Sequence, residues 1–306
     1  MLTLPALHAC RLAGAQRLTV LGTPASWGFI KSSHDSLRVR DFSSMEWLGL
    51  FSPDAALGPS AQAALAKTDT AIVYLQDADS VEAALKKTGI KTILRISPPT
   101  QSDRGSAHAA RRLLEPLSAF LSGKLCEETL EISAAKDDPF LALDEEERVR
   151  ALGSLGLDAA PAGGFAAIHP GSGGKSKCWP AEKFARLAVK LSCEFGRTPL
   201  VFFGPADDLA QEEFEAAMPP GVMWEAVKQR PLREVLALLS FAEWFIGNDS
   251  GMSHLAARLC GTLTIFGPTD PEVWAPLGRN VQVLRAPEGK LAHLNVDDVA
   301  ASLQNL

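Results

Sequence analysis

The chain has 306 residues, of which 46% are hydrophobic and 22% are charged, and this balance is typical of a soluble globular protein. Its formal net charge is -6 and its lysines and arginines are scattered, which excludes a protein that binds nucleic acid through a basic surface. The length suffices for two domains, each with its own hydrophobic core. The five cysteines form no C-x-x-C pair, which argues against a disulfide framework and a structural zinc site and fits a reducing compartment.

The N-terminal segment MLTLPALHACRLAGAQ begins with apolar residues and contains Ala-Gly-Ala, which imitates a signal-peptidase site. It lacks a basic region, and Arg11 interrupts the apolar run, so we predict an amphipathic helix with Leu4, Leu7 and Arg11 instead of a signal peptide. No stretch reaches the roughly 18 apolar residues of a transmembrane helix, although peripheral attachment to a membrane stays open. The protein is therefore expected in the cytoplasm, free or attached to the cytoplasmic face of the inner membrane.

Strand-like and helix-like runs alternate through the first half of the chain. The runs RLTVLG (17–22), TAIVYL (70–75) and KTILRI (91–96) are predicted strands, whereas residues 80–87 and 106–121 are predicted helices. This alternation indicates an α/β fold with a mainly parallel sheet.

The composition changes between Asp137 and Gly164, where the acidic run LDEEERVR is followed by small residues, and we interpret this segment as a linker. After it the alternation restarts, with predicted strands in FAAIHP, PLVFFGP, VMWEAV, WFIGND and TLTIFGP. We therefore predict an N-terminal domain over residues 1–158 and a C-terminal domain over residues 159–306, which face each other across a cleft. In open α/β sheets, ligands bind outside the carboxyl ends of the strands.

The segment HPGSGGKSKCWP (169–180) lies between a predicted buried strand and a predicted helix. Gly174, Lys175 and Ser176 match the end of the Walker A motif, but His169 stands where that motif needs its first glycine, which argues against a P-loop ATPase or kinase. A glycine-rich turn with lysines before a helix still suits a general anion site. A solvated loop whose lysines bind nothing is the alternative.

A second polar turn lies within FIGNDSGMSHLAARLCGTLTIFGPTDPEVWAPLG (245–278), between a predicted strand and a predicted helix. The backbone amides of Ser250, Gly251 and Met252 would lie at the start of this helix, where a diphosphate meets free N–H groups and the positive end of the helix dipole. Asp249 would be repelled by a diphosphate, so we expect it to accept hydrogen bonds from sugar hydroxyls.

Structural roles are the alternatives at this turn. Asn248 or Asp249 would then only cap the helix. His254, in the first turns of the helix, would be a core or capping histidine and not a catalyst.

The order of these motifs resembles glycosyltransferase family 9, whose best-known members are the ADP-heptose:lipopolysaccharide heptosyltransferases. The similar features are H-x-G after a strand, K-x-W-P before a helix, N-D-S-G-M-S-H-L-A-A and F-G-P-T-D-P, and more weakly LTLPALHACR and SAHAARRLLEPL in the first half. The resemblance implies a GT-B fold, in which two Rossmann-like domains bind the acceptor in the N-terminal domain and the nucleotide-sugar donor in the C-terminal one. It also implies an inverting transfer of a heptose or related sugar, with ADP-heptose as the expected donor and a lipopolysaccharide core or related lipid-linked glycan as the acceptor.

The same resemblance assigns roles to individual residues. Lys177 matches the phosphate-binding lysine of K-x-W-P, which would stabilise the leaving diphosphate in place of a metal, and Lys175 would be its solvent-exposed neighbour. Asp249 completes the predicted catalytic pair, and neither a metal nor a cofactor is expected. The predicted donor-binding residues are Ser172, Gly173, Asp208, Arg230, Ser250, Gly251, Met252 and His254.

Two of these assignments concern the nucleoside. The resemblance implies an acidic residue that holds the ribose, and we prefer Asp208 over Asp207 for this role, with an exposed helix start as the alternative. Arg230 lies in KQRPLREVLALL, which resembles the segment beside the nucleobase. The oligomeric state is left open.

The sequence departs from the family at its start. In the family a first strand leads to Gly-Asp, whose aspartate is the expected general base, and a helix like LTLPAL follows, whereas this sequence starts with that helix at Met1. We interpret Met1 as an internal methionine of a longer reading frame. The alternative is loss of the base, which would leave a non-catalytic module that binds nucleotide or glycan. Asp35, Asp41 and Glu46 are possible substitutes among which nothing selects, and a nucleotide-sugar epimerase is a further alternative.

Overall fold

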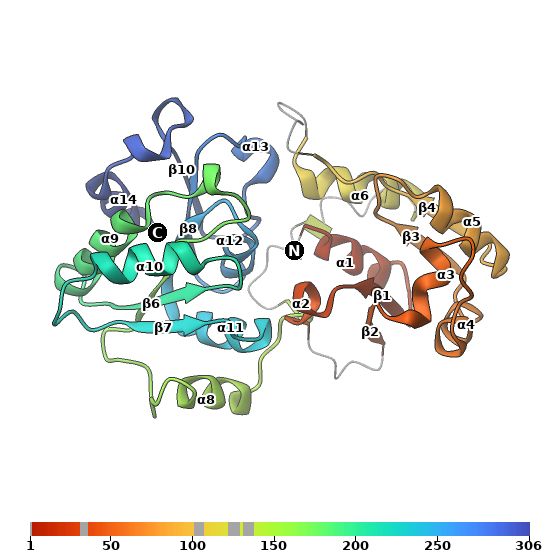
Figure 1. Cartoon of the computed structure of the whole chain (residues 1–306), viewed down its shortest axis with the longest axis horizontal. Coiled ribbons are helices and arrows are strands. Elements are labelled where there is room, and N and C mark those ends of the chain that lie inside the picture. The colour runs from red at the N-terminus through yellow and green to blue at the C-terminus, as the bar shows by residue number, and fades with distance from the viewer. Residues whose placement is uncertain (1, 31–35, 101–106, 122–128, 131–137) are drawn as a thin grey trace.

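The computed structural model describes residues 2–30, 36–100, 107–121, 129–130 and 138–306. The chain forms two lobes that lie side by side in Figure 1, one built by the first part of the sequence and one by the second. All paired strands run parallel, as predicted for the α/β fold. The domain boundary between residues 158 and 159 stays a prediction.

The first lobe contains two pairs of parallel strands surrounded by helices. Strand β1 (Leu18–Gly22) pairs with β2 (Leu37–Asp41), and β3 (Thr70–Val73) pairs with β4 (Thr92–Arg95). The helices and the 3₁₀ turn η1 are α1 (Leu4–Leu12), α2 (Pro24–Trp27), η1 (Met45–Trp47), α3 (Leu48–Phe51), α4 (Pro59–Leu65), α5 (Asp79–Lys87) and α6 (Ala109–Phe120). The three strands predicted in this half are confirmed as β1, β3 and β4, whereas β2 was not predicted.

Helix α1 confirms the helix predicted for the N-terminal segment. Leu4 packs toward β1, whereas Ala6 and Ala9 pack against α6, so both faces of α1 contribute to the core. His8 is also buried, and its Nε2 lies 3.0 Å from Oδ2 of Asp138. Within the described parts of the chain, no helix is both long enough and apolar enough to cross a membrane.

The second lobe is built on a six-stranded sheet with the order β10-β9-β8-β5-β6-β7. Its strands are β5 (Phe165–His169), β6 (Thr198–Phe203), β7 (Glu225–Lys228), β8 (Ala242–Asn248), β9 (Gly261–Phe266) and β10 (Val281–Arg285). Five of these strands were predicted, and β10 was not. The strand order reverses between β5 and β8, so the loops after these two strands flank the topological switch point.

Helices cover both faces of this sheet. They are α8 (Glu145–Gly153), α9 (Ala181–Cys193), α10 (Asp208–Ala217), α11 (Leu232–Leu239), α12 (Gly251–Ala256), α13 (Pro271–Trp274) and α14 (Val296–Ser302). The 3₁₀ turns are η2 (Lys175–Lys177), η3 (Pro287–Gly289), η4 (Leu291–His293) and η5 (Leu303–Asn305).

Alternate side chains of β5 enter two different hydrophobic clusters, as expected for a strand that is covered on both faces. Phe165 and Ala167 join the cluster that contains α11, whereas Ala166 and Ile168 join the cluster that contains α9. One apolar face of α9 is fully buried, at Phe184, Leu187, Ala188 and Leu191.

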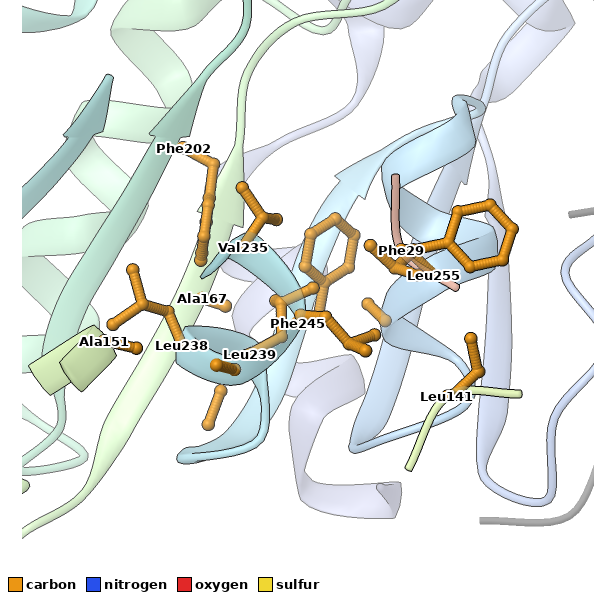
Figure 2. Packing of buried hydrophobic residues seen from close by; sticks show 14 of the residues in the cluster. Phe29, Leu141, Ala151, Ala167, Phe202, Val235, Leu238, Leu239, Phe245 and Leu255 are labelled. Atoms are coloured by element: carbon orange, nitrogen blue, oxygen red, sulfur yellow. The ribbon is translucent and has the colours of Figure 1, made fainter. Parts of the chain in front are cut away.

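The cluster around α11 also takes in side chains of the first lobe. Figure 2 shows Phe29, which follows α2, next to Leu255 of α12. Arg233 of α11 donates a hydrogen bond from Nη1 to the carbonyl of Phe29 at 3.0 Å. His108, before α6, lies with Nε2 2.8 Å from the carbonyl oxygen of Ala275. The two lobes are thus joined by apolar and polar contacts.

The predicted linker between Asp137 and Gly164 contains helix α8, which was not predicted. The Asp144 carboxylate accepts a hydrogen bond from the Glu147 amide at 2.8 Å, and the Glu147 carboxylate accepts one from the Asp144 amide at 3.0 Å. This capping box and the acidic first turn favour a helix. Glu147 also pairs with Arg233 of α11 at 2.6 Å, so α8 packs on the second lobe. Asp137 itself lies outside the described residues.

The four cysteines that the structure describes, Cys10, Cys178, Cys193 and Cys260, are free thiols. Cys126 lies outside the described residues.

Candidate functional site

The loops after β5 and β8 bring the two predicted motifs into direct contact. Lys177, in η2, lies with Nζ 3.0 Å from Oδ2 of Asp249, which follows β8. Thr269, after β9, donates its hydroxyl to the same carboxylate oxygen at 2.8 Å. The Lys177 side chain is 20% exposed and that of Asp249 is 8% exposed, so the ion pair is largely shielded from water.

The turn after β8 is held by hydrogen bonds to the other loops and does not cap α12. Asn248 is fully buried, accepts a hydrogen bond from the Trp179 amide and donates one to the Pro170 carbonyl, both at 2.8 Å. The N-cap of α12 is Ser250, and its side chain makes no capping bond. The alternative that Asn248 or Asp249 only caps this helix is therefore wrong, because their side chains are bonded to other loops.

The other predicted phosphate-loop residues have different surroundings. The Ser172 hydroxyl donates to the main-chain carbonyl of Asp249 at 2.8 Å and so ties the two loops together. Gly173 and Gly174 have open space where a Cβ would lie, so packing does not demand glycine there. Lys175 is exposed, as expected for a neighbour of the binding lysine.

A second buried polar pair lies at the end of β5. His169 approaches Asp207 with Nε2 3.0 Å from Oδ2, and its Nδ1 lies 3.4 Å from the hydroxyl oxygen of Ser250. His169 is 6% and Asp207 is 7% exposed. The Gly204 amide donates to the same Asp207 oxygen at 2.6 Å. A Cβ at Gly171 would overlap the Asp207 carboxylate, so this position requires glycine.

The environment of Asp207 keeps it ionised. Burial acts to raise its pKa, but the hydrogen bond and charge of His169 and the Gly204 amide together lower the pKa below the ordinary value. Asp208, which we predicted for the ribose, is exposed at the start of α10. The alternative for Asp207 and Asp208 was that both lie at the start of an exposed helix. Only Asp208 does so, because the Asp207 carboxylate is buried and hydrogen-bonded to its neighbours. The ribose role of Asp208 stays a prediction.

The remaining residues of the predicted turn lie on α12. Gly251 is exposed and Met252 is half-buried. His254 is buried, and burial is the main cause that lowers its pKa to about 3; nearby positive charges add to this, that of Arg258 more than that of Lys177. His254 is therefore neutral at physiological pH, and its place among the donor-binding residues stays a prediction.

Arg230 lies apart from this cluster, in the loop between β7 and α11. The strand order places β7 at the edge of the sheet, with β6 between it and β5. The Arg230 guanidinium lies 3.5 Å from the Glu234 carboxylate, and no contact within the described chain joins it to Lys177 or Ser250. Its contact with a nucleobase stays a prediction.

The acidic residues that we considered as substitute bases have other partners. Asp41 is half-buried at the end of β2, and hydrogen bonds from the side chain and main chain of Ser43 lower its pKa, which makes it a weaker base. Glu46 accepts hydrogen bonds from the amides of Ser60, at 2.9 Å, and Ala61, at 3.2 Å. Asp35 lies outside the described residues.

Sequence comparison places this chain in a known family. A profile of glycosyltransferase family 9 (heptosyltransferase) matches residues 79–303. Lipopolysaccharide heptosyltransferase 1 of Escherichia coli (strain K12) is 31% identical over 147 residues, which cover 47% of this chain and 45% of that protein. Lipooligosaccharide heptosyltransferase 2 of Haemophilus influenzae is 30% identical over 129 residues, which cover 41% of this chain and 37% of that protein. Each match thus spans less than half of the curated relative.

Solved structures resemble the chain over nearly its whole length. E. coli ADP-heptose lps heptosyltransferase II has a TM-score of 0.72 at 17% identity and covers 99% of this chain and 93% of its own. A family 9 glycosyl transferase from Veillonella parvula has a TM-score of 0.73 at 19% identity and covers 99% and 92%. At these identities the likeness shows the fold, which is GT-B as predicted. Since the family profile matches well over half of the sequence, the chain belongs to glycosyltransferase family 9, the heptosyltransferase family.

Proposed function

We propose that the chain transfers a heptose or related sugar from a nucleotide-diphosphate donor, with ADP-heptose as the expected donor, to a lipopolysaccharide core or related glycan. The transfer inverts the anomeric centre and needs neither a metal nor a cofactor. The observation that carries the proposal is the shielded Lys177–Asp249 pair at the switch point of the sheet, with Nζ and Oδ2 3.0 Å apart. A solved E. coli heptosyltransferase, 20% identical to this chain, was determined with ADP, the leaving group of such a donor.

In the proposed reaction Lys177 acts on the departing diphosphate. A phosphate oxygen that approaches Nζ shares it with Asp249, while Thr269 still donates to Oδ2 of that carboxylate at 2.8 Å. Lys177 can therefore turn toward the ligand without leaving Oδ2 of Asp249 unbonded. A fixed positive charge at the developing diphosphate stabilises the transition state more than the ground state, which is the role a metal has in other transferases.

Asp249 has a separate role in the proposal. Its Oδ2 is engaged by Lys177 and Thr269, whereas its Oδ1 has no hydrogen bond within the described chain. A free carboxylate oxygen beside the diphosphate position can accept a hydrogen bond from a sugar hydroxyl. Such a contact orients the anomeric carbon for in-line attack.

A non-catalytic module that binds the donor is the second candidate function. One observation favours this module. The carboxylates of Asp41 and Glu46, two possible bases in the first lobe, already accept hydrogen bonds from neighbouring groups of the chain. Transfer needs a base that removes the proton of the acceptor hydroxyl.

We also propose that the protein works in the cytoplasm and contacts the inner membrane from that side, because a lipid-linked acceptor is held there. Exposed apolar side chains support this contact, and Phe42 and Phe51 lie with ring centroids 5.8 Å apart. Met45, which lies between these two residues in the sequence, is 78% exposed. Flotation of the protein with vesicles that contain anionic lipid tests the proposal, and a Met45→Ser variant should float less.

The reaction is tested by incubating the chain with ADP-heptose and a heptose-free lipopolysaccharide core. Release of ADP together with a heptosylated product of inverted anomeric configuration is the expected result, unchanged by EDTA. Binding of ADP without transfer would support the non-catalytic module. Release of free sugar or nucleotide without an acceptor would indicate the epimerase alternative.

A further inference from the structure

Arg258, which follows α12, carries a positive charge that is buried without its usual hydrogen bonds. The residue is 3% exposed, and within the described chain its buried Nε and Nη1 have no hydrogen-bond partner. Burial lowers the pKa of Arg258 to about 10, so the guanidinium is still charged at neutral pH. A buried charge without hydrogen bonds destabilises a fold, and buried polar groups in proteins are normally bonded. A missing partner is therefore to be sought outside the chain.

Arg258 lies on the side of α12 that begins at the proposed diphosphate position. Gly251, His254 and Arg258 are three and four residues apart, so they share one side of this helical segment. Burial is the main cause of the low pKa of His254, and the charge of Arg258 lowers it further, so the two side chains lie near each other. At 1.5 Å per residue, Arg258 is about 10 Å along the axis from Gly251. With the buried His254 between them, a diphosphate at the start of α12 does not supply the missing partner.

The first lobe lies opposite this part of α12 and offers Arg258 one acidic group, which is already bonded. Leu255 of α12 lies next to Phe29 of the first lobe (Figure 2). The charge of Asp138 opposes the effect of burial on the pKa of Arg258, so this carboxylate is also near. Its Oδ2 lies 3.0 Å from Nε2 of His8 in α1, and its Oδ1 accepts a hydrogen bond from a main-chain amide at 2.9 Å. Asp138 thus offsets part of the charge but leaves Nε and Nη1 of Arg258 unbonded.

We propose that Arg258 binds an oxyanion of the sugar acceptor, a carboxylate or a phosphate, where the two lobes meet. A guanidinium suits both groups, because its N–H donors match their oxygen atoms in charge and geometry. The acceptor hydroxyl must approach the anomeric carbon of the donor sugar, which is bonded to the diphosphate, so an acidic group close to that hydroxyl comes within reach of Arg258. The inference rests on the proposed function for the identity of the ligand, but the anion site can be tested without sugar transfer.

A ligand site and a purely structural role predict opposite effects on stability. Arg258→Met keeps an apolar side chain in place but removes the unbonded charge, so it should raise the urea midpoint of the whole chain in Tris chloride buffer. Arg233 is the matched control, because it is also shielded, at 18% exposed, but is paired with Glu147. Arg233→Met should lower the urea midpoint, because it leaves that carboxylate unpaired. If Arg258 only stabilised the fold, both substitutions would lower it.

Small sugar acids probe the ligand. Thermal unfolding of the whole chain is followed with D-glucuronate, glucose 6-phosphate or uncharged glucose, each with ADP present. At least one acid should raise the melting temperature as its concentration increases, whereas glucose should not, and the two acids distinguish a carboxylate site from a phosphate site. Arg258→Met should lose this effect and Arg258→Lys should keep a smaller part of it. Lys177→Ala should retain it, which shows that the acid does not act at the proposed diphosphate position.

Sugar transfer gives a third measurement and separates the inference from the proposed function. Arg258→Met should raise KM for an acceptor that carries the acidic group roughly ten- to a hundredfold and leave KM for ADP-heptose unchanged. A lowered urea midpoint in Arg258→Met would overturn the inference. So would absence of stabilisation of the wild type by both acids, or equal stabilisation of Arg258→Met. Absence of ADP binding and of transfer, with the effects of the acids intact, would instead overturn the proposed function while the anion site stood.

Discussion

Lys177→Ala and Lys175→Ala form a matched pair of substitutions in the proposed donor site. The two lysines are two positions apart in η2, but their surroundings differ. Lys177 is 20% exposed and paired with Asp249, whereas Lys175 is exposed and its side chain makes no hydrogen bond or ion pair within the described chain. We therefore expect Lys177→Ala to weaken ADP binding strongly and Lys175→Ala to change it little.

The expected size of the Lys177 effect has two contributions. Loss of a charge-assisted hydrogen bond to the diphosphate removes about 1.5–3 kcal/mol, or roughly ten- to a hundredfold in Kd. Without Lys177, the shielded Asp249 carboxylate also keeps only the hydrogen bond from Thr269 and repels the incoming diphosphate. Both contributions act in the same direction, so we expect the upper half of this range. A solvated lysine contributes about 1 kcal/mol or less.

A double substitution separates the two contributions. Asp249→Asn has nearly the shape of the native side chain but removes its charge, so adding it to Lys177→Ala should restore part of the lost ADP affinity. Calorimetric titration of ADP into the wild type and the single and double variants measures the effects, and circular dichroism checks that each variant folds. Equal losses from Lys177→Ala and Lys175→Ala would refute the assignment. Absence of any recovery in the double variant would refute the repulsion argument.

Three further predictions concern the architecture of the site. Gly171→Ala should destabilise the fold and weaken ADP binding, as measured by urea unfolding and calorimetry, because its Cβ would overlap the Asp207 carboxylate. The folded-state pKa of Asp207 is lowered, so its ionised form stabilises the fold above the unfolded pKa of about 3.9, and this contribution is lost as the pH falls through the folded value. The urea stability of the wild type should therefore exceed that of Asp207→Asn at pH 7, and the difference should vanish in strong acid. Finally, a fragment of residues 138–306 should bind ADP, because all loops of the donor site lie within it. A fragment of residues 160–306 lacks α8 and should melt at a lower temperature, since Glu147 of α8 pairs with Arg233; equal melting temperatures would contradict this packing argument.

The sequence predicted five strands of the second lobe's sheet and the two loops of the proposed donor site from local patterns. Apolar runs that end in glycine-rich or polar turns identified β5 and β8, and the strand order brings the ends of those strands together. Lys177 and Asp249 were both selected from their motifs. Their contact with each other was not predicted, because Lys177 was assigned to the diphosphate and Asp249, which a diphosphate would repel, to sugar hydroxyls.

His169 and Asp207 show what local patterns cannot supply. His169 was noted as the residue that breaks the Walker A pattern and as the histidine of H-x-G, without a role of its own, and Asp207 was set aside in favour of Asp208. Their pairing depends on the adjacency of β5 and β6 and on the space that Gly171 leaves, neither of which is visible in a linear sequence. In contrast, a signal for α8 was present, because Asp144 followed by Glu147 is a capping-box pattern.

Hydrogen bonds hold the loops of the proposed donor site together before any ligand binds. Asn248 fixes the loop after β5 to the end of β8, and Asp207 fixes that loop to the one after β6 through His169 and Gly204. These bonds lie among side chains that are almost fully buried, so binding a diphosphate should require little ordering of the loops. What must change is the division of Lys177 between Asp249 and the ligand. Affinity at this site should therefore respond to single charges more strongly than to the flexibility of the loops that carry them.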